Sequence, residues 1–112
     1  MKFFITEAQR KTKHSTCYFE FLKGTFQNRC WNEDSIYLHA DVFDALRLYP
    51  TFAESLPHFA YYGVTQVTPS QYQKLKSLAL EQGGETAAVM QELDLWVENC
   101  FLTETCFTIC GI

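Results

Sequence analysis

The sequence lacks the features that mark several common classes of protein. It has no internal repeat or low-complexity tract, and no apolar run near the roughly 20 residues that span a bilayer. The opening MKFFITEAQR has an apolar part too short for a signal peptide, and Glu7 interrupts it. These absences predict a cytoplasmic protein that does not associate with membranes.

The usual motifs of catalysis and metal binding are also missing. The chain has no Cys-x-x-Cys pair, no Gly-x-Ser-x-Gly, no glycine-rich phosphate-binding loop and no His-Glu-x-x-His. Cys106 and Cys110 lie four residues apart in the terminal segment CFTICGI. On a strand that spacing is roughly 13 Å, too far for one zinc ion with Zn–S bonds of about 2.3 Å. We therefore predict no metal, no cofactor, and thiols that fill space as small apolar groups.

The composition is that of one globular domain over residues 1–112. Apolar residues make up 47% of the chain and charged residues 20%, a balance that argues against disorder. Aromatic residues reach 16%, more than a small core requires. Some of these rings are therefore expected on a surface that contacts another molecule.

Charge is distributed unevenly along the chain. The net charge is −4, but residues 1–29 contain six basic and two acidic residues, a net charge of +4. The remaining residues contain three basic and eleven acidic residues, a net charge of −8. An acidic surface repels phosphate backbones and attracts basic proteins, so we expect no nucleic acid partner. The alternative is an acidic surface that serves only solubility.

The N-terminal segments predict strands. KFFIT is a short apolar run, QRKTKHS is a polar loop, and Phe19 and Phe21 of TCYFEFL fall on one face with Cys17. If Lys23-Gly24 forms a two-residue turn, TCYFEFL pairs with TFQNRCW in a hairpin and Cys17 lies opposite Cys30. A disulfide is then conceivable, although free thiols are typical of a reducing cytosol.

The central segment predicts short elements. SIYLHA is a third strand or an extended entry into a helix. Asp41 is the expected N-cap of that helix, with Asp44 near its positive end, and Pro50 ends the helix or begins another. HFAYYGVTQV is rich in β-forming residues, and Gly63 marks a bend or bulge.

The C-terminal half predicts two helices and a strand. Thr68, Pro69 and Gln71 form a helix N-terminus with a capping box, and Gly83-Gly84 end that helix. A second helix is expected from about Glu85 to about Phe101, with an apolar stripe that includes Trp96. CFTICGI then alternates as a strand. The fold class is therefore α+β: a mostly antiparallel sheet of about four to five strands packed against two to four helices in a single-domain sandwich.

Three segments resemble the small acidic immunity proteins of bacterial polymorphic-toxin and contact-dependent growth-inhibition systems. They are FAYYGVTQVTPSQYQKLKSL, MQELDLWVENC and the terminal CFTICGI, which cover roughly the C-terminal half. The resemblance implies a protein that binds one cognate toxin domain, in many cases a basic nuclease, and neutralises it. Acidic and aromatic side chains are then the expected binding surface: Glu33, Asp34, Asp41, Asp44, Glu85, Glu92, Trp31, Tyr37, Tyr61 and Tyr62.

Two other classes of function stay open from the sequence. The first is a non-catalytic interaction or regulatory domain that binds another protein or a small ligand. The second is a small enzyme that uses Cys17 with a histidine such as His39, or the paired carboxylates Glu33-Asp34 or Asp41-x-x-Asp44. The oligomeric state is also open, because a terminal edge strand would offer unpaired backbone groups to a second chain.

Overall fold

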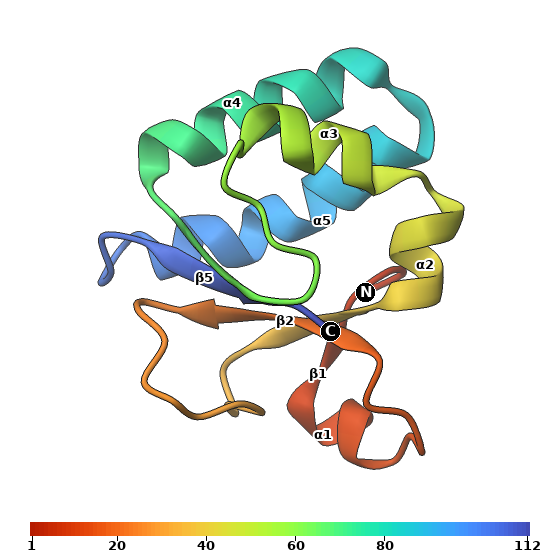
Figure 1. The fold of residues 1–112 in the computed structure, drawn as a ribbon, viewed down its shortest axis with the longest axis vertical. Coiled ribbons are helices and arrows are strands. Elements are labelled where there is room, and N and C mark those ends of the chain that lie inside the picture. Colours follow the sequence, from red (N-terminus) through yellow and green to blue (C-terminus); the bar gives the residue numbers. More distant parts are fainter.

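The computed structural model describes residues 1–112 as an open five-stranded antiparallel sheet with five helices (Figure 1). The sheet order is β1-β3-β2-β5-β4, and the strands are β1 Ile5–Thr6, β2 Tyr18–Lys23, β3 Ile36–His39, β4 Val64–Val67 and β5 Phe107–Cys110. The helices are α1 Glu7–Lys11, α2 Ala40–Ala45, α3 Leu48–Ser55, α4 Pro69–Gln82 and α5 Gly84–Cys100. The predicted α+β class is confirmed, with one more helix than expected.

The two faces of the sheet are covered differently. Figure 1 shows α3, α4 and α5 above one face, with α1 and the segment 24–35 below the other. The helix-covered face contains the main core, a single cluster that includes Phe19, Phe21 and Phe107 from the strands and Leu75 and Leu93 from the helices. The Phe19–Phe21 face predicted from alternation is therefore the core face.

Helices α4 and α5 begin and end close to where the sequence places them. Thr68 accepts a hydrogen bond from the Gln71 backbone while the Gln71 side chain accepts one from the Thr68 backbone, and Pro69 opens α4. Gly83 has a φ of +68°, a conformation that side chains disfavour, so it separates the two helices. Trp96 lies on the core side of α5 but is only half-buried.

The opposite face of the sheet is organised around one buried carboxylate. Glu20 is 1% exposed, and its oxygens accept hydrogen bonds from the backbone N–H groups of Trp31 (2.7 Å) and Asn32 (2.9 Å). The Ser35 hydroxyl, at 2.7 Å, and the Tyr37 hydroxyl, at 3.3 Å, also donate to it. These bonds fasten the irregular segment 24–35 to the sheet and satisfy backbone donors that have no strand partner.

The predicted hairpin between TCYFEFL and TFQNRCW is wrong. Strand β2 pairs with β3 on one side and β5 on the other, so no edge is free for residues 25–31. Asn28 and Trp31 adopt positive φ values of 59° and 64°, which an extended strand does not contain. Cys17 and Cys30 are consequently not cross-strand neighbours, and both are free, exposed thiols.

Three further expectations need correction. The polar segment after Thr6 is not all loop, because Thr6 and Gln9 form a capping box that starts α1. The N-cap of α2 is His39, whose ring accepts a hydrogen bond from the Asp41 backbone, so Asp41 lies in the first turn instead. The terminal strand β5 is not an edge, since it pairs with both β2 and β4.

Candidate functional site

The segment between α3 and β4 presents two tyrosines at one end of the sheet. Tyr61 is half-buried, with its ring 5.0 Å from that of Phe19 and 5.9 Å from that of Phe43. Its hydroxyl donates to the Asp44 carboxylate, whose two oxygens both lie at 3.1 Å. The core therefore fixes the ring, and Asp44 fixes the hydroxyl.

Other exposed aromatic and acidic side chains surround Tyr61. Tyr62 is 80% exposed, and its ring centroid lies 4.7 Å from that of Tyr61. Tyr49 on α3 is 46% exposed, and its centroid lies 6.3 Å from Tyr61. Asp41 lies one helical turn before Asp44 on α2, and its side chain is 92% exposed. We call these five residues the acidic tyrosine patch: Asp41, Asp44, Tyr49, Tyr61 and Tyr62.

The end of β5 holds this segment in place. The Gly111 N–H donates to the Gly63 carbonyl at 2.7 Å, and the Ile112 N–H donates to the Tyr61 carbonyl at 2.9 Å. A Cβ atom at position 111 would lie 2.1 Å from the Tyr61 carbonyl oxygen, so only glycine fits. The Gly-Ile sequence that follows β5 thus positions Tyr61 and Tyr62.

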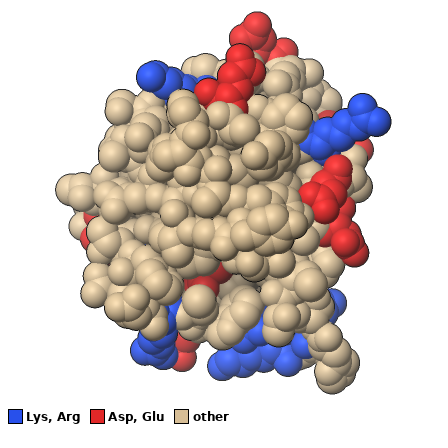
Figure 2. All heavy atoms as spheres, viewed as in Figure 1, with Lys and Arg blue, Asp and Glu red and all other residues tan.

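The negative charge of the patch comes from its aspartates. Burial, and then the hydrogen bond and charge of Asp44, raise the pKa of Tyr61, so its phenol stays neutral. No lysine or arginine forms an ion pair with Asp41 or Asp44, and the His39 ring lies 3.8 Å from Asp41. Figure 2 shows acidic side chains at the margin beside α2, with a basic side chain next to them, and an uncharged surface over residues 56–63 and the C-terminus.

Glu92 holds the N-terminal segment, a structural role that the sequence pattern did not predict. Its carboxylate accepts hydrogen bonds from the backbone N–H groups of Lys2 (2.9 Å), Phe3 (3.0 Å) and Phe4 (2.7 Å). It therefore ties the N-terminal segment to α5. Because its oxygens already accept these bonds, Glu92 is not part of the candidate binding surface.

The remaining predicted site residues lie outside the patch. Tyr37 is fully buried, so the prediction that it contacts a partner is wrong. Trp31 is half-buried under the Arg10 guanidinium, 4.0 Å from its ring, on the opposite face of the sheet. Three acids are exposed, but no hydrogen bond or ion pair of their side chains joins them to the patch: Glu33, Asp34 and Glu85.

One serine–histidine–aspartate arrangement exists, and its protonation is wrong for a catalytic base. The Ser15 hydroxyl lies 3.2 Å from His39 Nε2, and Asp41 Oδ2 lies 3.8 Å from Nδ1. The Asp41 backbone N–H donates to the same Nδ1 at 3.0 Å, so that nitrogen bears no proton. In neutral His39 the proton is on Nε2 and points at Ser15, whereas a base needs a lone pair there. The trio caps α2.

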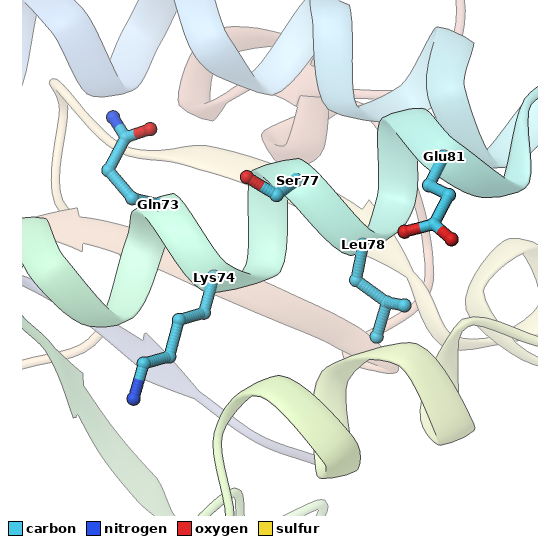
Figure 3. Close-up of a pocket in the computed structure, with 5 residues that line it drawn as sticks. All are labelled: Gln73, Lys74, Ser77, Leu78 and Glu81. Carbon is cyan, nitrogen blue, oxygen red and sulfur yellow. The ribbon is translucent and has the colours of Figure 1, made fainter.

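The only pocket lies on α4. Gln73, Lys74, Ser77, Leu78 and Glu81 line an open hollow of about 420 Å³, with Leu78 pointing toward α3 (Figure 3). No hydrogen bond or ion pair joins the side chains of Lys74, Ser77 and Glu81, so the hollow does not assemble a nucleophile with a base. No group of three histidine, cysteine or acidic side chains is placed to hold a metal ion.

Comparison of the chain with protein-family models, with curated proteins and with solved structures finds no match. None of the five helices combines the length and the apolar character needed to cross a bilayer. The acidic tyrosine patch is therefore the candidate site on the strength of its own geometry.

Proposed function

We propose that this protein binds a basic protein partner through the acidic tyrosine patch and neutralises it, as an immunity protein neutralises its cognate toxin domain. The observation that carries the proposal is the Tyr61–Asp44 contact, in which a core-anchored ring and an unpaired aspartate form one rigid exposed surface. Tyrosine is enriched among residues that dominate binding energy at protein interfaces.

The patch has the physical properties that fast and tight binding requires. Aspartates without cation partners attract a basic surface and raise the association rate, more strongly at low ionic strength. Rings that are already packed lose little conformational entropy on binding, so more of the contact energy appears as affinity. Tyr61 rests on Phe19 and Phe43, and Tyr62 rests on Tyr61.

The segments that resemble immunity proteins also build the patch. FAYYGVTQVTPSQYQKLKSL supplies Tyr61, Tyr62, β4 and most of α4, and CFTICGI supplies β5 and the residues that hold the tyrosines. The resemblance and the geometry therefore favour the same end of the molecule. Asp41 and Asp44 add the charge from α2, outside the resembling segments.

The proposal predicts that the gene immediately upstream encodes a large secreted protein, whose C-terminal domain is the toxin to be used in the test. Production of that domain in a bacterial host should stop growth, and co-production of this protein should restore it. The purified pair should bind with a dissociation constant in the nanomolar range, about −12 kcal/mol. If no such gene exists, or if co-production gives no protection, the proposal is wrong.

Two matched alanine variants locate the surface. Tyr62→Ala removes a ring that is 80% exposed, and Leu102→Ala removes a side chain that is 79% exposed outside the patch. Tyr62→Ala should weaken binding by roughly 30-fold, the effect of an anchor residue contributing about 2 kcal/mol. Leu102→Ala should change affinity by less than about twofold. Equal effects would show that the partner binds another surface.

A further inference from the structure

Two thiols from distant parts of the chain meet on the sheet face that α1 and residues 24–35 cover. The β2–β5 register places Cys110 opposite Glu20, so their side chains lie on the same face of the sheet. The Glu20 carboxylate accepts the backbone N–H of Trp31 at 2.7 Å, which brings the preceding residue, Cys30, to the same place. Cys30 and Cys110 therefore both lie beside the Glu20 side chain, and Cys30 is among the neighbours that raise the pKa of Cys110.

The two thiols differ in accessibility. Cys30 is exposed, whereas Cys110 is 7% exposed at the end of β5. Burial, and then the Glu20 carboxylate, raise the pKa of Cys110 to about 12. Cys30 is therefore the thiol that a reagent in solution reaches first, and Cys110 is a protected second thiol beside it.

We propose that Cys30 and Cys110 are a redox pair that closes to a disulfide by exchange with a small-molecule disulfide such as oxidised glutathione. The Cys30 thiolate attacks one sulfur of the reagent, whose S–S bond breaks and releases one small thiol. Cys110 then gives its proton to solvent and attacks the Cys30 sulfur, which releases the second small thiol. The protein loses two electrons and two protons, and the reagent gains them.

The bond would change how residues 24–35 are held. That segment is fastened mainly by hydrogen bonds to Glu20, and the disulfide would join it covalently to the last residue of a central strand. Because the bond closes a loop of about 80 residues, we expect the melting temperature to rise by about 20 °C. The other exposed thiol, Cys17, precedes β2 and takes no part.

The test uses the reduced full-length protein and excess oxidised glutathione. The expected product has lost about 2 Da, and peptide mapping joins Cys30 to Cys110. Because the closing step needs the Cys110 thiolate, its rate should rise about tenfold per pH unit between roughly pH 7 and pH 9. A reducing agent should reverse both the bond and the gain in melting temperature.

Three variants separate this pair from the alternatives. Cys110→Ser should stop at a mixed disulfide on Cys30, Cys30→Ser should form no internal bond, and Cys17→Ser should behave as the wild type. Cys30 and Cys17 are exposed, so their variants keep the test valid even if Cys110→Ser folds poorly. The proposal is overturned if glutathione stays on Cys30 of the wild type, if mapping finds another pair, or if no thiol reacts.

Discussion

Substitution of Gly111 by alanine tests how the end of β5 supports the acidic tyrosine patch. The added methyl group would lie 2.1 Å from the Tyr61 carbonyl oxygen, so the two backbones must separate. The Gly111–Gly63 and Ile112–Tyr61 hydrogen bonds would then lengthen or break. Two such bonds contribute about 1 kcal/mol each, and forced displacement adds about 1 kcal/mol or more. We expect a loss of about 3 kcal/mol.

The assay is urea denaturation, with amide hydrogen exchange at residues 61–63 as a local measurement. Exchange there should accelerate more than exchange in α4, because the damage begins at the tyrosine segment. Gly63→Ala is the matched control, since its methyl group would meet only the Ala60 side chain, at 3.0 Å, and should cost about 1 kcal/mol. A loss of unfolding free energy in Gly111→Ala no larger than that in Gly63→Ala would show that the end of β5 does not support the tyrosine segment.

Three further predictions concern buried or anchoring carboxylates. Glu20→Gln keeps the side-chain volume but replaces one accepting oxygen with an NH₂ group that faces other donors. The free energy of unfolding measured in urea should fall by about 3 kcal/mol. A fall below about 1 kcal/mol would contradict the role of Glu20 as the centre of this network. Glu92→Gln should speed amide hydrogen exchange at residues 2–4 by at least about fivefold and leave exchange in α4 unchanged. The same exchange rates at residues 2–4 in the variant and the wild type would contradict the role of Glu92 in holding the N-terminal segment. Burial opposes ionisation of Asp94, but hydrogen bonds from Tyr72 (2.6 Å) and Lys76 (3.1 Å) outweigh it and lower the pKa. The ionised Asp94 carboxylate therefore stabilises the fold fully above its pKa in the unfolded chain, about 3.9, and this stabilisation is lost as the pH falls through the lower pKa of the folded state. In an acid titration, Asp94→Asn should lose less unfolding free energy than the wild type, and an equal loss would contradict this role.

Local interactions explain why the helices were predictable from the sequence. The capping boxes at Thr6 and Thr68 join residues three apart, so their whole signal lies in a short stretch of sequence. The capping box at Thr6 is hard to recognise because charged residues follow it, although Thr6 and Gln9 have the required spacing. The β5 strand was predictable from alternation, but its central place in the sheet depends on pairing with distant β2.

Long-range interactions explain what the sequence could not show. Glu20 looks like a solvent-facing strand residue, and only its partners 11 to 17 positions later make it the centre of a buried network. Glu92 likewise reads as an exposed helix acid, because its partners are about 90 residues away. Asp44 and Tyr61 were both predicted to be site residues, but nothing in the sequence showed that they touch, or that Tyr49 lies beside them.

The association rate with the proposed toxin partner, measured at low and high salt, separates the acidic tyrosine patch from the rest of the surface. The patch variant is Asp41→Lys with Asp44→Asn, which keeps an acceptor for Tyr61. The control is Glu85→Lys with Glu104→Gln, an equal change in charge at exposed residues elsewhere. We predict that the patch variant binds at least about tenfold more slowly at low salt, that high salt removes most of this difference, and that the control stays within about threefold. Equal slowing of both variants would contradict the assignment of this surface.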